Sequence, residues 1–474
     1  MKQYIALLVV SLFTVIAHST PVYPRLQKGK DVPPPAPGTL LRMLQDHSEK
    51  NVAPMEAPDR SFRSLWIRMF PLLSVPLGDP YPETQDLYHL SMAAPAPINI
   101  YALDDGQLLA TATQIELDFA AGTVGVNGGV FNLEMLWILP SGNDPVLVTW
   151  DKGRTRDGKS TEVRVKLRGG FVIRPSTHSR RDGTPPEQLW SMINVVTVNS
   201  YLRSVVPSEV IASWHSETLK AQAIAARTYG MYEVAQARSD GMDYDMDPTT
   251  WYQSYQGVEF YLRESRVWRS VELPATTSAV SATGSQVITY QGEVIKAFFS
   301  SNSGGRTCTY IECLEGSRNP GYLLEKNDAA GVRNSPGGSW GSRANITPAT
   351  VTERLRVVGI TPRSPVRKLE HLERGPSNRT WRLRVRLADG SVINLDRQQT
   401  RKMMSTFGPI RSFHYELGTV GTNGKQRIVG RGYGHGVGMS QWGAQLFARQ
   451  GWNAQRILKY FYSGVEIADL GAGS

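Results

Sequence analysis

Apolar and polar residues alternate over a long stretch of the first half of the chain, from about residue 97 to residue 197. Short alternating runs are typical of antiparallel strands that bury one face. Turn residues such as Asp104-Asp105-Gly106 separate the runs, as expected for hairpins. The pattern predicts a β-rich region with strands at residues 98–103, 110–119, 145–150 and 161–167.

The spacing of apolar residues becomes helical after residue 215. An alanine-rich segment runs from Ser216, the predicted N-cap, through Glu217 in the first turn to Tyr229. Shortly before it, Pro207 precedes Glu209 by two residues, and proline is well tolerated in the first turn of a helix. We therefore expect Glu209 in the opening turn of a short helix, followed by a long helix.

Strands and helices are mixed in the remaining residues. The pattern predicts a hairpin turning at Gly292, a last helix capped by Asn453, and between them a helix and two strands at residues 348–355, 381–387 and 391–395. The predicted fold class is α+β, with the β-rich region preceding the mixed part.

The first residues resemble an export signal. Lys2 precedes an apolar stretch at residues 5–17, and Ala17-His18-Ser19 places small residues at the cleavage-determining positions. We expect a signal peptide over residues 1–19 and a periplasmic, envelope or extracellular location. Membrane attachment is expected only if this segment stays uncleaved. A proline-rich linker is expected over residues 20–59.

Composition narrows the class of partner. The chain of 474 residues is 41% hydrophobic and 20% charged, which is typical of a folded protein rather than a disordered one. The formal net charge of +10 favours an anionic partner. Because the basic residues are scattered and form no long run, we do not expect nucleic acid to be that partner.

The chain contains two cysteines, Cys308 and Cys313. In an oxidising compartment such a close pair favours a disulfide, with free thiols as the alternative. A zinc site would need two further ligands, and none is evident nearby. We expect no metal and no cofactor.

Three segments are richer in polar residues and glycine than a plain core requires: 206–209, 298–306 and 430–443. In the third, alternating glycines would let the backbone approach a ligand closely. His435, Ser440 and Gln441 could then face that ligand. The alternative is a tight turn around a hydrogen-bonded histidine. A phosphate loop is excluded because no Gly-Lys-Ser/Thr ending follows.

These segments, with the long helix, resemble the ordered signature blocks of the SpoIID/LytB (stage II sporulation protein D) family. The blocks are VPSE at 206–209, LKAQAIAARTY at 219–229, FSSNSGGRT at 299–307 and GYGHGVGMSQWGA at 432–444. The resemblance covers about residues 191–467. We expect a SpoIID/LytB-like domain over residues 161–474, and a β-rich region of unknown role over residues 60–160.

Similarity to this family implies a peptidoglycan lytic transglycosylase that acts on glycan strands already stripped of their peptides by an amidase. Its products would carry 1,6-anhydromuramyl ends. The family's acid corresponds to Glu209, which would act first as acid and then as base. For this residue the alternative is a carboxylate that only caps a helix. For the protein, the alternative is a non-catalytic wall-binding protein that enhances an amidase.

The resemblance also suggests a substrate groove between the Glu209 helix, the long helix and the His435 loop. Two cations of the long helix could pair with the lactyl carboxylate of muramic acid, or simply face solvent. Its glutamine could contact N-acetyl groups, and serines with the histidine loop could form a hydroxyl-rich wall. The expected substrate contacts are Lys220, Gln222, Arg227, Ser300, Ser303, His435, Ser440 and Gln441.

Overall fold

The computed structural model describes residues 64–69, 89–102, 107–120, 123–133, 135–154, 160–175, 190–242, 244–248, 252–262, 265–314, 318–341, 346–407, 410–422 and 424–470. The expected signal peptide and proline-rich linker lie outside these residues. Within the described part of the chain, no helix is both long and apolar enough to cross a membrane.

The described residues form two units. The N-terminal unit contains those up to Val287, together with 292–296 and 468–470. The C-terminal unit contains 288–291 and 297–467. The chain passes between the units within β13 (Gln286–Tyr290), near β14 (Glu293–Val294), and within β23 (Glu466–Asp469).

A 12-stranded sheet dominates the N-terminal unit, with the order β1-β10-β9-β6-β2-β7-β8-β11-β12 and with β3, β4 and β5 continuing from β2. Its neighbouring strands are antiparallel, as the alternating pattern predicts. The strands are β1 (Ser64–Arg68), β2 (His89–Ala102), β3 (Leu108–Ala120), β4 (Thr123–Val126), β5 (Gly129–Phe131), β6 (Leu136–Pro140), β7 (Val146–Arg154), β8 (Ser160–Leu167), β9 (Gly170–Pro175), β10 (Trp190–Thr197), β11 (Glu259–Leu262) and β12 (Val267–Ser270).

The sheet extends beyond the region expected to be β-rich. Because β7 pairs with β8, the boundary expected near residue 160 falls inside the sheet. β11 also joins the sheet through β8, so a strand from the family-like part of the sequence pairs with the earlier strands. The two parts therefore share one sheet.

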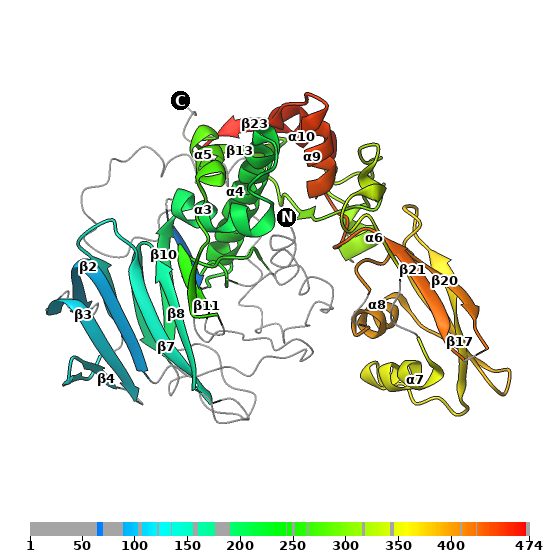
Figure 1. Ribbon diagram of the computed structural model, residues 1–474, viewed down its shortest axis with the longest axis horizontal. Helices are drawn as coiled ribbons and strands as arrows, with labels where there is room; N and C mark the ends of the chain where they lie inside the picture. Colours follow the sequence, from blue (N-terminus) through cyan, green and yellow to red (C-terminus); the bar gives the residue numbers. More distant parts are fainter. Residues whose placement is uncertain are drawn as a thin grey trace. The chain divides into compact units, whose positions relative to one another are not determined.

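Three helices pack together in the N-terminal unit: α3 (Val198–Glu209), α4 (Ser216–Ser239) and α5 (Pro274–Ala282), drawn in green in Figure 1. The alanines at 221, 223, 225 and 226 of α4 are fully buried, which allows neighbouring helices to approach closely. The predicted long helix is present, but its N-cap is His215, one residue before the expected Ser216, and it continues past Tyr229 to Ser239.

The C-terminal unit is built from small sheets and short helices. Two of its sheets have the orders β17-β18-β19 and β16-β21-β20, and β15 pairs in parallel with β22. The strands are β15 (Phe299–Ser300), β16 (Ser339–Gly341), β17 (Val366–Arg374), β18 (Thr380–Leu387), β19 (Val392–Asn394), β20 (Tyr415–Val420), β21 (Gln426–Arg431) and β22 (Met439–Ser440). The helices are α6 (Tyr310–Leu314), α7 (Pro348–Val357), α8 (Arg397–Ser405), α9 (Gln441–Arg449) and α10 (Ala454–Phe461).

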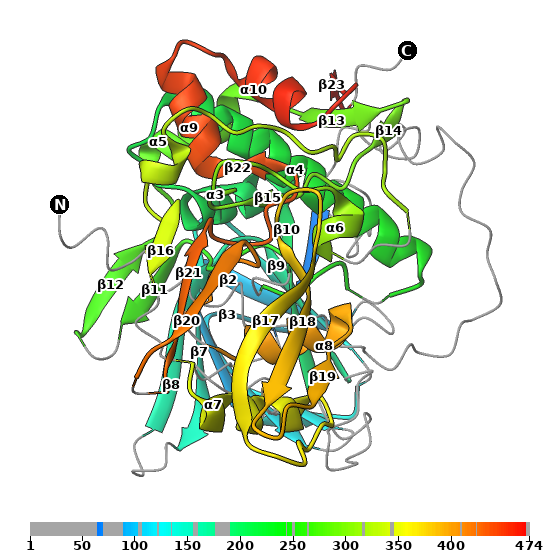
Figure 2. The same ribbon diagram turned by 90° about the vertical axis from the view of Figure 1, so that its right-hand side faces the viewer.

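One hydrophobic core unites α7, α8 and the strands β17 to β21. Leu355 of α7, Met403 of α8 and Leu383 of β18 are among its fully buried members. Both helices lie on the same side of the yellow and orange strands, as Figures 1 and 2 show. The expected helix at 348–355 and strands at 381–387 and 391–395 correspond to α7, β18 and β19. Together the two units confirm the α+β class.

Candidate functional site

Glu209 lies at the opposite end of its helix from the one predicted. It is the last residue of α3, which begins at Val198 after the N-cap Thr197, and Pro207 lies in the last turn. The expectation of an opening turn was therefore wrong. The backbone partial charge at this end of a helix is negative, so the helix dipole does not stabilise an ionised carboxylate here. A purely capping role for Glu209 loses its physical basis.

The half-buried carboxylate of Glu209 is held by a loop between α4 and β11. The backbone N–H of Ser254 donates to Oε1 of Glu209 at 3.1 Å. Two residues further on, the backbone N–H of Gln256 donates to the hydroxyl of Ser204 at 2.9 Å. These two bonds fix residues 252–256 along the last turns of α3.

A buried tyrosine supports this arrangement from the first turn of α3. Tyr201 stacks on Tyr255, with ring centroids 5.5 Å apart, and its hydroxyl donates to Oε1 of Gln253 at 3.0 Å. Burial raises the pKa of the Tyr201 phenol well above its usual value, and the charge of Glu209 raises it further. Tyr201 therefore stays protonated and keeps its hydrogen bond to the loop.

Sequence reasoning missed this loop. Its sequence, Tyr252-Gln253-Ser254-Tyr255-Gln256, combines tyrosines with amide and hydroxyl side chains and was the available signal. The contact that matters most comes from the backbone N–H of Ser254, and no side-chain pattern identifies such a group.

The three predicted contacts on α4 lie in different surroundings. Lys220 is partly exposed and pairs with Glu217, with Nζ and Oε1 2.7 Å apart. Gln222 is fully buried, and Arg227 is 2% exposed. The Arg227 guanidinium donates to the carbonyls of Val280 and Gln286 at 3.2 and 3.1 Å. Burial thus corrects the expectation that Arg227 and Gln222 face a ligand, and leaves Lys220 as the accessible member.

The serines of the C-terminal unit that were predicted to contact substrate are buried. Ser300, Ser303 and Ser440 are at most 6% exposed. The Ser300 hydroxyl accepts the N–H of Gly436 at 3.2 Å, and the Ser303 hydroxyl donates to Asp328 at 2.5 Å. These groups hold the signature loops together, which corrects the expectation that they form a wall open to a sugar. Gln441, at the start of α9, is also buried.

Asp328 is a carboxylate that sequence reasoning did not single out. Burial raises its pKa, while hydrogen bonds with Ser303, Ser440 and the backbone of Ala329 act in the opposite direction. A Cβ at Gly443 would meet Oδ1 of Asp328 at 1.8 Å, so only glycine leaves room for the carboxylate beside α9. Asp328 therefore joins two signature blocks. As a single aspartate in an irregular segment outside both blocks, it gave no pattern from which to predict this contact.

The His435 ring is half-buried beside Phe298, with ring centroids 5.8 Å apart. Its Nδ1 accepts the N–H of Val437 at 2.9 Å. Burial, together with the nearby charges of Arg401 and Arg379, lowers the pKa of His435 to about 4. The imidazole is therefore neutral at neutral pH.

Acidification is expected to destabilise the fold through His435. The neutral ring is favoured in the folded state, whereas in the unfolded chain it binds a proton below its ordinary pKa of about 6.5. The unfolded state thus binds more protons, so the free energy of unfolding should fall as the pH drops from about 6.5 to about 4. Denaturant unfolding across this range should show a smaller decrease for His435→Asn, whose amide oxygen can still accept the Val437 N–H. An equal decrease in both proteins would contradict this origin.

Gly438 has a φ of +70°, a left-handed backbone conformation that favours glycine. A Cβ at this position would lie 2.0 Å from the carbonyl oxygen of Phe298. Gly438→Ala is expected to lower the free energy of unfolding by at least about 2 kcal/mol, from backbone strain and overpacking. The matched control is Gly424→Ala, where φ is +71° and nothing lies within 4 Å. Urea denaturation should show a clearly larger loss at Gly438; equal losses would contradict the steric argument.

Cys308 and Cys313 form a disulfide. It lies next to the His435 loop, since the N–H of Cys308 donates to the carbonyl of Gly436 at 2.9 Å. Among the described residues, no group of three or more His, Cys, Asp or Glu side chains is placed to hold a metal ion.

The candidates thus form two sets. Glu209 and Lys220 remain accessible in the N-terminal unit, and His435 in the C-terminal unit. Because each unit is described by itself, a single groove that contains both sets stays a prediction.

Comparison with known proteins identifies related sequences. Residues 187–290 match the family model described as Stage II sporulation protein (SpoIID), and residues 342–438 match a domain of unknown function (DUF8618). The first match contains α3, α4 and Glu209. The second begins just before α7 and ends within the His435 loop.

Three relatives show how far the similarity extends. An uncharacterised protein of Brachyspira hyodysenteriae is 31% identical over 280 residues, which are 59% of this chain and 68% of the relative. Stage II sporulation protein D of Bacillus amyloliquefaciens is 30% identical over 280 residues, 58% of this chain and 75% of the relative. The amidase enhancer of Bacillus subtilis is 27% identical over 314 residues, 56% of this chain but only 40% of the relative. The chain belongs to the stage II sporulation protein D (SpoIID) family.

Proposed function

We propose that this protein is an exported cell-envelope enzyme that cleaves the glycan strands of peptidoglycan as a lytic transglycosylase, with Glu209 as its acid and base. The observation that carries the proposal is the setting of Glu209. A half-buried carboxyl group at the negative end of a helix suits a group that must carry a proton, and the backbone N–H of Ser254 orients it.

The proposed reaction needs a single carboxyl group. The protonated Glu209 gives its proton to the glycosidic oxygen of the departing sugar as the bond to the anomeric carbon of muramic acid breaks. The 6-hydroxyl of the same muramic acid then bonds to that carbon, and its proton goes to the Glu209 carboxylate. The acid is thereby regenerated, and no water is consumed.

A hydrolase would require more groups. It needs a second carboxylate across the bond, either as nucleophile or to activate water. Glu209 supplies the single carboxyl group that the transglycosylase route requires, and the backbone N–H of Ser254 orients it. The partly exposed Lys220 suits the lactyl carboxylate of the substrate.

Analysis of the products tests this proposal. Mature protein is incubated with peptide-free strands and, separately, with intact peptidoglycan, and the released sugars are measured by mass spectrometry. We expect 1,6-anhydromuramyl ends, mainly from the peptide-free strands. Reducing ends would indicate hydrolysis, and the absence of any released sugar would contradict an enzymatic role.

A second function is favoured by one of the relatives, which is named amidase enhancer. The alternative is a wall-binding protein without activity of its own that raises the activity of an amidase. It predicts that adding this protein accelerates peptide release by a purified wall amidase, and that Glu209→Gln preserves the acceleration. A requirement for the Glu209 carboxyl group would instead favour the enzyme.

A further inference from the structure

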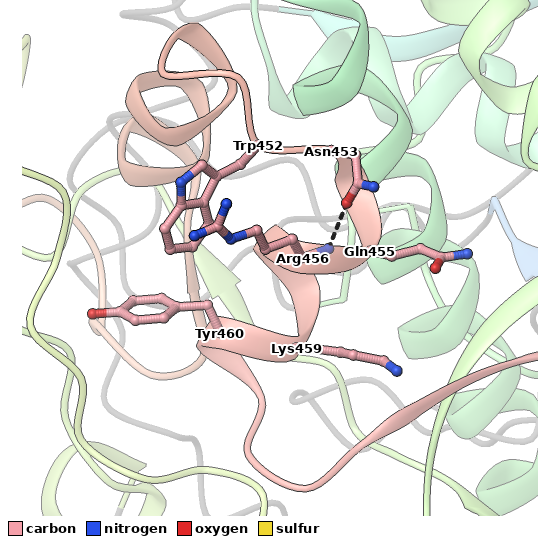
Figure 3. Close-up of a pocket in the computed structure, with 6 residues that line it drawn as sticks. All are labelled: Trp452, Asn453, Gln455, Arg456, Lys459 and Tyr460. Carbon is pink, nitrogen blue, oxygen red and sulfur yellow. Dashed lines mark hydrogen bonds between the residues drawn. The ribbon is translucent and has the colours of Figure 1, made fainter.

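A pocket in the C-terminal unit is formed by residues that follow the last signature block, which ends at residue 444. We call it the α10 pocket; it is lined by Trp452, Asn453, Gln455, Arg456, Lys459 and Tyr460. Figure 3 shows Arg456 lying against the indole of Trp452, with Tyr460 next to them, while Gln455 and Lys459 extend away from the rings. The lining therefore combines aromatic rings, amides and cations.

The guanidinium of Arg456 is held in place by aromatic stacking. Its central carbon lies 3.9 Å from the centroid of the Trp452 ring. The other face of Trp452 stacks on Phe447, with centroids 4.2 Å apart and planes inclined by 11°. Arg456 remains exposed, so stacking orients a cation whose N–H groups can still bind an anion at two points.

The positive charge around the pocket comes from Arg456, Lys459 and the nearby Lys326. Lys459 is exposed, and Nζ of Lys326 lies 5.9 Å from the centroid of the Tyr460 ring. Within the described part of the chain, no carboxylate is within ion-pair distance of Arg456, Lys459 or Lys326. Arg386, by contrast, pairs with Glu370 at 2.7 Å. The pocket therefore offers its cations to an external anion.

The amides indicate what should surround that anion. Asn453 uses its Oδ1 to cap α10, accepting the N–H of Arg456 at 2.9 Å, which leaves its NH₂ group to donate. Gln455 is exposed and has both a donor and an acceptor. Amides beside a bidentate cation suit a carboxylate carried on a sugar with hydroxyl and acetamido groups.

We propose that the α10 pocket binds the free lactyl carboxylate of muramic acid and so distinguishes peptide-free glycan strands from intact ones. This inference rests on the proposed function for the identity of the polymer. In intact peptidoglycan the lactyl group is joined to the stem peptide as an amide and carries no charge. Removal of the peptide exposes one carboxylate on each muramic acid, and the paired cations of the pocket recognise that change.

The test measures binding without cleavage. Full-length Glu209→Gln protein is titrated with soluble peptide-free strands, and with the same strands after their carboxylates have been reduced to alcohols. Arg456→Ala with Lys459→Ala removes two exposed cations from the pocket. Arg356→Ala with Arg427→Ala removes two exposed cations elsewhere in the same unit and serves as the matched control.

We expect the pocket variant to bind peptide-free strands about tenfold more weakly than the control, as for the loss of a charge-assisted contact. Both variants should bind the reduced strands equally. Equal affinity of the two variants for the unreduced strands would overturn the site. A pocket variant that is equally impaired on reduced strands would overturn the carboxylate as its ligand.

Failure of this site can be distinguished from failure of the proposed function. If the protein with Glu209 intact cleaves strands but the two variants bind them equally, the proposed role of the pocket is rejected and the proposed enzymatic function is retained. If binding depends on the pocket but no strand is cleaved, the enzymatic function is rejected and the pocket is retained as a carboxylate-binding site.

Discussion

Replacing Glu209 with glutamine is expected to lower the rate of glycan-strand cleavage by about a thousandfold, the usual range for loss of a general acid. Glutamine has nearly the same shape, and its amide oxygen can still accept the Ser254 N–H that now binds Oε1. The loop at residues 252–256 should therefore stay in place. The decrease in rate would then result from the loss of the acidic proton and not from a change in structure.

The measurement compares initial rates of 1,6-anhydromuramyl release from peptide-free strands. Glu259→Gln is a suitable control because it makes the same chemical change in the same unit, at a glutamate on β11 that pairs with Lys166. It should retain nearly full activity. Undiminished cleavage by Glu209→Gln would show that another group supplies the proton.

The structure explains why Glu209 was assigned to the wrong end of its helix. The buried strand β10 passes directly into α3 at Thr197, with no glycine or proline between them. Apolar residues continue on both sides of this junction, as Val195 and Val196 before it and Val198 after it, so the pattern did not mark the start of the helix. Pro207 then suggested a beginning, whereas in the structure it lies in the last turn.

Elements that depend on local sequence were predicted well. The long helix α4 follows from a run of strong helix formers, and the predicted cap at Asn453 uses a side chain three residues from the N–H that it binds. The hairpin around Gly292 was predicted too, although its second strand is only two residues long. In each case the stabilising contact is close in sequence.

The candidate site was predicted only in part, because its contacts join distant residues. Ser303 and Ser440 are 137 residues apart, and the N–H of one donates to the hydroxyl of the other at 3.3 Å. The sequence identified both as polar residues in glycine-rich segments. It could not show that their partners are protein groups, since a serine that faces a sugar and one that joins two loops look the same.

Arg227 illustrates the same limit for a charged residue, and its substitution should have a large effect on stability. Its guanidinium is buried and binds the carbonyls of Val280 and Gln286 and the hydroxyl of Thr283. Burial lowers its pKa to about 10, so it stays charged at neutral pH. Arg227→Ala would remove these bonds and leave a cavity, at a cost of about 3 kcal/mol or more in the free energy of unfolding.

Denaturant unfolding monitored by circular dichroism measures this cost, and Arg227→Lys provides the graded control. Lysine lacks the planar group that reaches several acceptors, but it keeps the charge and most of the side-chain volume. Arg227→Lys should therefore lower the free energy of unfolding less than Arg227→Ala does. Glycan affinity per folded molecule should be unchanged in both variants, because the guanidinium faces the α5 region and not solvent. An Arg227→Ala protein of normal stability that binds glycan weakly would reverse this conclusion and restore Arg227 as a ligand contact.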